Sequence, residues 1–209
     1  MGLIAPKVFS EFFESGEDNY DNKFIAVLAK YVRLYSIFLS VTITAYYIAI
    51  LSYHVDTLPI DFIIGISNAG QGVPFTVFVG AIILEMIMEL LRESLIRIPK
   101  QIGPAIGIVG GIVIGQAAIS AKLFSPLLLI VVAVSLLSSF TAPDYTIMNP
   151  LRIIKFFLII ASGSFGLIGF ILGVSIVAIN MISTSTFGVP YLAPFAPFNW
   201  YDFKIPQTK

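Results

Sequence analysis

Four long apolar runs without Asp, Glu, Lys or Arg constrain this chain most strongly. They cover residues 34–53, 101–120, 123–142 and 156–182. A helix of about 20 apolar residues is long enough to cross the roughly 30 Å hydrocarbon core of a bilayer. Charged residues make up 11% of the chain, and its mean hydropathy is +0.95. A water-soluble domain of this size needs more charge on its surface. The sequence therefore predicts an all-α, polytopic integral membrane protein.

Composition also excludes several classes of function. Twelve basic residues balance twelve acidic residues, so no nucleic-acid partner is indicated. The chain has no Cys and a single histidine, His54, which excludes disulfides, Cys-ligated metals and a histidine metal cluster. The motifs GxSxG, HExxH, GxGxxG and the phosphate-binding P-loop are absent from the sequence. We therefore expect a protein that is not an enzyme and that needs no metal or cofactor.

The chain divides into three parts. Residues 1–33 are polar and form a short N-terminal stub that we expect to be aqueous or interfacial. Residues 34–183 carry the transmembrane helices. Residues 184–209 form an aromatic, Pro-rich tail, a composition typical of the membrane interface.

Two connections and one bend are expected within the membrane part. Pro and Gly residues predict a loop over 54–74 and a short turn over 143–155. The run 156–182 is too long for one untilted crossing, and its glycines permit a bend.

Basic residues predict the orientation. They cluster around 30–33, 92–100 and 152–155, whereas 54–74 contains no Lys or Arg. The positive-inside rule then places the N-terminus and the turns near 92–100 and 143–155 in the cytoplasm, with Lys122 as the exception. This pattern predicts four or five transmembrane helices.

One of these helices, expected from about Phe75 to Arg97, is amphipathic and charged. At about 100° per residue its five ionisable groups share an arc of about 140°. These groups are Glu85, Glu89, Arg92, Glu93 and Arg97. The spacing favours pairs of Glu89 with Arg92 and of Glu93 with Arg97, while Glu85 has no basic neighbour one turn away. Within this helix the stripe is net negative.

Three interpretations of the charged stripe remain open from periodicity alone. The helix could lie in the interface with its charges in water. The stripe could face other protein and be neutralised there by ion pairs. It could instead line a hydrated cavity or a cation path, because ionisable groups at membrane depth usually face water or a partner.

A second stripe consists of small residues. Glycines recur every four residues in the next helix, at Gly103, Gly107, Gly111 and Gly115. Three overlapping GxxxG steps are typical of close helix packing in membranes. The sequence leaves open whether this seam packs within one subunit, packs between subunits or lines a narrow path.

The chain resembles the membrane domain of the A subunit of spore germinant receptors, the GerA family of endospore-forming bacteria, or its close spore-membrane paralogue. The resemblance covers about nine-tenths of the chain and rests on residues 72–143 and 186–204. Its core is the ordered pattern E-x3-E-x2-RE-x3-R-x-P, followed by "IVGGIVIGQAA" and, near the end, "APFAPFNWYDFK".

This resemblance implies a subunit of the spore inner membrane that acts in germination. Members of the family carry a large soluble N-terminal domain, of which residues 1–33 would be a remnant. Expected partners are further copies of the chain, a transporter-like, nutrient-binding B subunit and a lipoprotein C subunit. The resemblance implies an oligomeric, nutrient-gated channel for monovalent cations.

In such a channel, Glu85, Glu89 and Glu93 are candidates for the ion path, with Arg92 and Arg97 as their charge partners. Two other classes remain. A secondary transporter would show inverted repeats, but the sequence holds no second copy of the 83–99 pattern. A non-conducting membrane scaffold would keep the charged stripe dry or interfacial.

Overall fold

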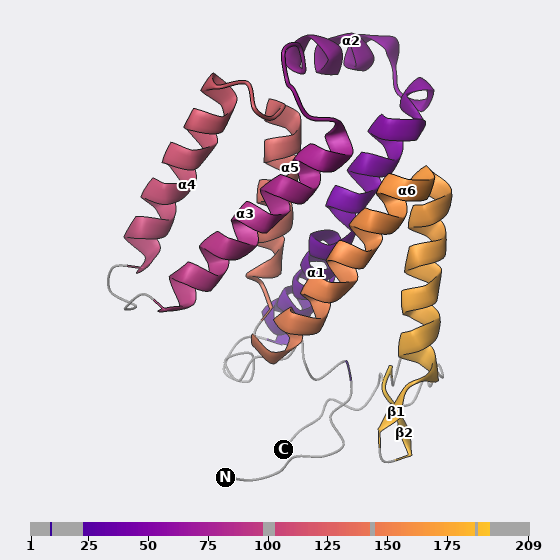
Figure 1. The fold of residues 1–209 in the computed structure, drawn as a ribbon. Helices are drawn as coiled ribbons and strands as arrows, with labels where there is room; N and C mark the ends of the chain where they lie inside the picture. The colour runs from indigo at the N-terminus through magenta and orange to yellow at the C-terminus, as the bar shows by residue number, and fades with distance from the viewer. Residues whose placement is uncertain (1–8, 10–22, 98–102, 143–144, 187, 193–209) are drawn as a thin grey trace.

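The structure, a computed structural model, describes residue 9 and residues 23–97, 103–142, 145–186 and 188–192. These residues are mostly helical, with one short antiparallel hairpin (Figure 1). The elements in chain order are α1 (Lys23–Tyr53), the 3-10 turn η3 (Val55–Thr57), α2 (Ile60–Ala69), α3 (Val77–Arg97), α4 (Gly103–Ser120), α5 (Pro126–Ser139), α6 (Tyr145–Ser183), β1 (Ser185–Thr186) and β2 (Val189–Pro190).

Helix α1 lies at the centre of the bundle and packs against α6, α5 and α3. Its buried residues recur every three or four positions, as expected for one face of a helix. They are Ile37, Ser40, Val41, Thr44, Ala45, Ile48 and Ala49; Thr42 is also buried, and its hydroxyl donates a hydrogen bond to the carbonyl of Phe38 on its own helix. Apolar side chains of α3, α5 and α6, including Leu84, Val132 and Leu158, complete the core against this face.

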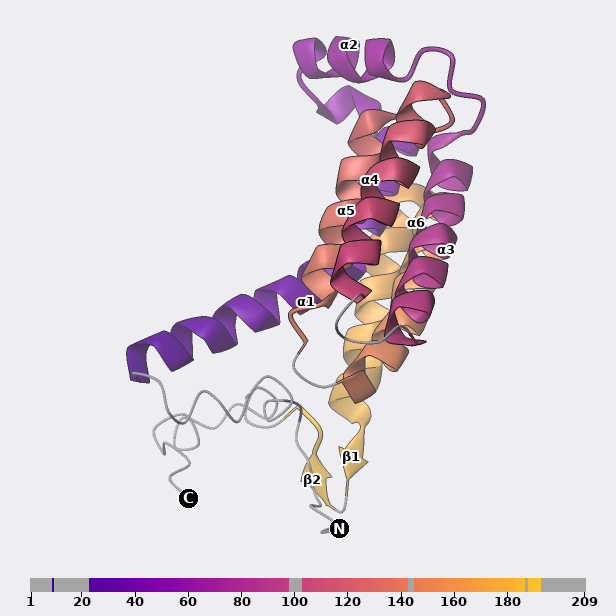
Figure 2. The ribbon, with the colours of Figure 1, turned by 90° about the vertical axis from the view of Figure 1, so that its left-hand side faces the viewer.

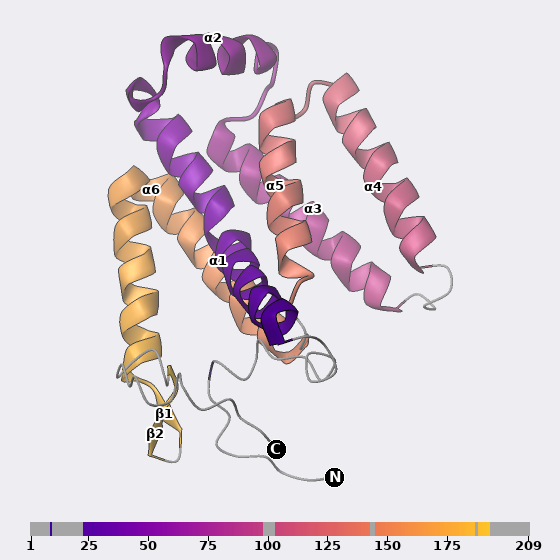
Figure 3. The same ribbon diagram turned by 180° about the vertical axis from the view of Figure 1, so that it is seen from behind.

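Helix α6 reverses direction at Gly166, so that its second half runs back alongside the first (Figures 1 and 3). Gly166 has φ 62° and ψ −140°, a conformation that only glycine adopts readily. A Cβ on Gly169 would overlap the carbonyl of Ala161, and one on Gly173 would meet Leu158. The glycines thus permit both the reversal and the close contact of the two halves, which confirms the predicted bend.

The helix boundaries differ from the expectation in three places. The expected loop over 54–74 contains helix α2, because its breakers Pro59 and Gly70 flank an apolar stretch instead of interrupting it. The expected turn over 143–155 is helical from Tyr145 onward, with Pro150 inside the helix. Helix α1 begins at Lys23 and therefore extends well before the predicted span that starts at Leu34.

Two helical segments are long and apolar enough to cross a membrane by length and composition, Phe24–Tyr53 and Met148–Ser183, although the second is divided into two antiparallel halves at Gly166. Helices α2 and α5 are apolar but shorter. Helix α4 lies at the edge of the bundle beside α3 (Figures 1 and 3). The expected four or five crossings stay a prediction.

Candidate functional site

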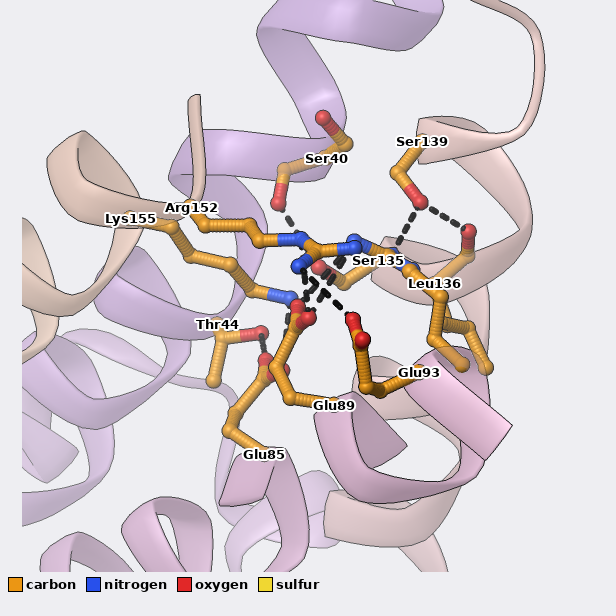
Figure 4. A network of polar contacts seen from close by, with 11 residues as sticks. Ser40, Thr44, Glu85, Glu89, Glu93, Ser135, Leu136, Ser139, Arg152 and Lys155 are labelled. Carbon is orange, nitrogen blue, oxygen red and sulfur yellow. Dashed lines mark hydrogen bonds and ion pairs between the residues drawn. The ribbon is translucent and has the colours of Figure 1, made fainter. Parts of the chain in front are cut away.

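Six ionisable side chains meet where α3 and α6 approach α1 and α5 (Figure 4). Four come from the charged face of α3 and two from the first turns of α6. We call this set the charged cluster; its members are Glu85, Glu89, Arg92, Glu93, Arg152 and Lys155. The expected stripe is therefore one side of an interhelical network.

Glu85 is the most deeply buried member, with 1% of its surface exposed. The Nζ atom of Lys155 lies 2.5 Å from Glu85 Oε2. On the other side, the Thr44 hydroxyl of α1 donates a hydrogen bond of 2.7 Å to Glu85 Oε1. Glu85 therefore joins α1, α3 and α6, and its basic partner comes from a segment that the sequence had predicted to be a turn.

Glu89 lies between two guanidinium groups. Its Oε1 is 3.1 Å from Arg92 Nη1, as the i, i+3 spacing predicted. Its Oε2 lies 3.0 Å from Arg152 Nε, an ion pair without hydrogen-bond geometry. Arg92 in turn donates a hydrogen bond to the Ser139 hydroxyl and lies over the ring of Phe140, 5.4 Å from its centroid. These contacts attach α3 to α5 as well as to α6.

Glu93 lies at the exposed edge of the cluster. Its side chain is 51% exposed, against 15% for Glu89. Its Oε2 lies 3.9 Å from Arg152 Nη1. The predicted partner Arg97 ends helix α3, but its side chain lies outside the part that the structure describes, so the Glu93–Arg97 pair stays a prediction. Among the three glutamates, Glu93 is the one with substantial access to the surroundings.

The formal charge of the cluster sums to zero, because three carboxylates face three cations. Helix α3 alone contributes an excess of negative charge, which Arg152 and Lys155 of α6 offset. Removing charges from water is costly, and mutual attraction compensates only when the geometry is good. Close pairing within a network of zero net charge therefore offsets the desolvation cost and allows six charged side chains to lie between apolar helices.

A small, partly open hollow borders the cluster, with room for about one water molecule. Its polar lining comes from Ser40, Glu89, Arg92, Ser139, Arg152 and Lys155. The Nε group of Arg92 is buried and has no hydrogen-bond partner among the residues that the structure describes. A polar hollow with an unsatisfied donor is the kind of place where proteins hold ordered water.

The predicted glycine seam lies on α4. A Cβ on Gly111 would meet no atom within 4 Å, and one on Gly115 would lie 3.8 Å from a methyl group of Leu129 on α5. The surroundings of Gly103 and Gly107 lie outside the described part of the chain. Part of this seam therefore faces away from the rest of the subunit, and its packing role stays a prediction.

Sequence reasoning missed four polar members of the site: Thr44, Ser139, Arg152 and Lys155. One signal was available for the basic pair, since the i, i+3 spacing of Arg152 and Lys155 places both on one face if the segment is helical. The Pro residues around them instead favoured a turn. For Thr44 and Ser139 no local pattern distinguishes a contact with another helix from a bond to their own backbone.

Comparison with known proteins assigns the family. The family model described as "Bacillus/Clostridium GerA spore germination protein" matches residues 1–207. The spore germination protein GerLA of Bacillus cereus is 40% identical over 204 residues, which are 98% of this chain and 42% of that protein. The spore germination protein KA of Bacillus subtilis is 39% identical over 219 residues, covering 99% of this chain and 40% of that protein.

A third relative, the uncharacterized membrane protein YfkQ of Bacillus subtilis, is 32% identical over 196 residues and covers 94% of this chain. The chain spans about two-fifths of the length of these curated relatives. No solved structure matches it. A membrane-protein relative and two helices of membrane-spanning length together point to a membrane. The chain belongs to the GerA family of spore germination proteins.

Proposed function

We propose that this chain is the membrane part of an A-type subunit of a nutrient germinant receptor in the spore inner membrane. The observation that carries the proposal is the family match over residues 1–207, together with relatives that are named spore germination proteins. The role is that of a non-enzymatic subunit that works with B-type and C-type subunits.

We further propose that several copies of the chain assemble and conduct monovalent cations. Two features of the structure support this. Gly111 faces open space on the outer helix α4, so a helix of a second copy can approach its backbone closely. Glu93 presents a carboxylate at the exposed edge of the charged cluster, where a hydrated cation can reach it.

The three glutamates then have different roles in this proposal. Glu85 and Glu89 hold α3 against α6, because each lies within about 3 Å of a cation of the same chain. Glu93 is the residue that attracts the permeating ion. Replacing all three residues together would therefore disturb the fold and the ion path at once.

The test is cation flux through the reconstituted chain with the single change Glu93→Gln. We expect a lower monovalent-cation flux and weaker discrimination against anions, while Glu93→Asp, which keeps the charge, retains both. Asp61→Asn is the matched control, because Asp61 is an exposed acidic residue on α2, at the opposite end of the bundle from Glu93. Unchanged flux and selectivity in Glu93→Gln would remove the assignment of Glu93 to an ion path.

A non-conducting scaffold is the second candidate. The observation in its favour is the neutral cluster, in which each carboxylate has a basic partner within the chain. A scaffold would show no cation flux above that of empty vesicles, with the wild-type chain as well as with the Glu93 variants.

A further inference from the structure

The hollow beside the charged cluster is surrounded mainly by positive charge. Four of the six ionisable residues of the cluster line it: the cations Arg92, Arg152 and Lys155, and the carboxylate Glu89. The other two carboxylates of the cluster are not among the lining residues. The side chains that border the hollow therefore carry an excess of two positive charges, although the cluster as a whole is neutral.

Two guanidinium groups of this lining have a donor left over. In Arg92, which is 4% exposed, Nη1 donates to Glu89 and Nη2 donates to the Ser139 hydroxyl. The buried Nε of Arg92 has no hydrogen-bond partner in the described part of the chain. The Nε of Arg152 is buried as well, and its contact with Glu89 lacks hydrogen-bond geometry. A buried donor without a partner is costly, so an acceptor bound in the hollow would stabilise both residues.

The hydroxyl groups of the lining offer a ligand no free proton. Ser40 donates its proton to the carbonyl of Ile37, and Ser139 donates its proton to the carbonyl of Leu136 (Figure 4). The donors that remain for a ligand therefore belong to the cationic side chains. Hydrogen bonds between ionised partners are about twice as strong as those between neutral groups. This set of donors favours an anion over a neutral acceptor.

The size of the hollow limits what the anion can be. Its space suits about one water molecule. A phosphate or carboxylate group, including one on a lipid, is too large, whereas a single halide ion is only slightly larger than water. Apolar side chains of Val41, Met148 and Leu151 complete the lining. Screening of the cations by solvent is therefore weaker here than at an exposed surface.

We propose that the hollow binds a single halide ion, such as chloride, between Arg92 of α3 and Arg152 and Lys155 of α6. Water satisfies the same donors but does not offset the excess of positive charge. The bound ion lies beside Glu89 and leaves the whole cluster with one negative charge in excess, so we expect weak binding and rapid exchange. The ion bridges α3 and α6 and is not conducted, so the proposal does not depend on ion conduction.

Rapid exchange makes chloride NMR the suitable measurement. A chloride ion that exchanges between solution and a protein site gives a broader signal than free chloride. The full chain is studied in a mild, uncharged detergent, with the detergent alone as the reference. We expect excess broadening that bromide removes, because bromide fits the same site. Gluconate, added at the same sodium concentration, should leave the broadening unchanged because it is too large for the hollow.

Single substitutions test whether this broadening comes from the hollow. Arg152→Gln should reduce the bromide-sensitive broadening several-fold, while Arg152→Lys, which keeps the charge, should retain part of it. Lys122→Gln is the matched control, because Lys122 is an exposed basic residue in the turn between α4 and α5. That turn lies at the end of the bundle next to α2, whereas α3 ends and α6 begins at the other end (Figures 1 and 2).

Three outcomes would overturn the proposal. The absence of excess broadening would mean that the hollow holds water only. Equal losses of broadening in Arg152→Gln and Lys122→Gln would mean that chloride associates with basic side chains in general. Crystals of the wild-type chain grown in bromide should show an anomalous peak between Arg92 and Arg152, and the absence of that peak would also exclude the site. The crystal measurement needs no variant, so it decides the question even if Arg152→Gln folds poorly.

Discussion

The ion pair between Glu85 and Lys155 allows a quantitative prediction. At 2.5 Å and an effective dielectric constant of about 20, the attraction between the two charges is about 7 kcal/mol. Desolvating two ions costs several kcal/mol each, so the net contribution of the intact pair to stability is small. Lys155→Met removes the cation but leaves Glu85, 1% exposed, with the hydrogen bond from the Thr44 hydroxyl. We expect this variant to lose about 3–5 kcal/mol of unfolding free energy.

The assay is thermal unfolding of the purified chain in mild detergent, followed by circular dichroism. For a chain of this size the loss corresponds to a decrease in melting temperature of about 10 °C. The double variant Glu85→Gln with Lys155→Met should recover most of it, because no buried charge is left unpaired. Glu93→Gln is the control, since its half-exposed pair contributes at most about 1 kcal/mol. If the unfolding free energy lost by the double variant equals the loss of Lys155→Met plus the loss of Glu85→Gln alone, the two residues do not interact and the reasoning fails.

Two further predictions concern glycines. Gly166→Ala should lower the stability of the chain by about 1–3 kcal/mol, because alanine does not readily adopt φ 62° and its Cβ would press on the Tyr53 ring; the same unfolding assay checks this. Gly111→Leu should reduce the oligomeric fraction of the chain in native mass spectrometry, whereas Gly110→Leu, one position off the seam and also facing open space, should not. Equal effects of Gly110→Leu and Gly111→Leu would argue against a seam between copies.

Local patterns in the sequence predicted the features that depend on local rules. The charged helix was expected over 75–97 and is observed over Val77–Arg97, with the Glu89–Arg92 pair at its predicted spacing. The bend in the last apolar run was expected from its glycines and occurs at Gly166. Both follow from helix periodicity and from the conformational freedom of glycine, which neighbouring residues alone determine.

Features that depend on distant parts of the chain were not predicted. Lys155 lies far from Glu85 in the sequence, and no periodicity relates two helices that meet only in the folded bundle. The sequence predicts a cytoplasmic turn at the basic residues 152 and 155, whereas the structure places Lys155 in α6 and buries it against Glu85. The positive-inside rule counts basic residues in loops, so a basic residue that is paired within the bundle carries less information on orientation.

The paired state of the cluster limits how the proposed cation path could work. A cation path that touches all three glutamates requires α6 to move away from α3, because Lys155 is paired with Glu85 and Arg152 is paired with Glu89. A path that touches Glu93 alone needs no such movement, since that side chain is already half exposed. The cost of opening the first kind of path includes unpairing the buried charges, the quantity that Lys155→Met measures. A large loss of stability in Lys155→Met together with a flux change in Glu93→Gln would therefore favour a path along the edge of the cluster over one through its centre.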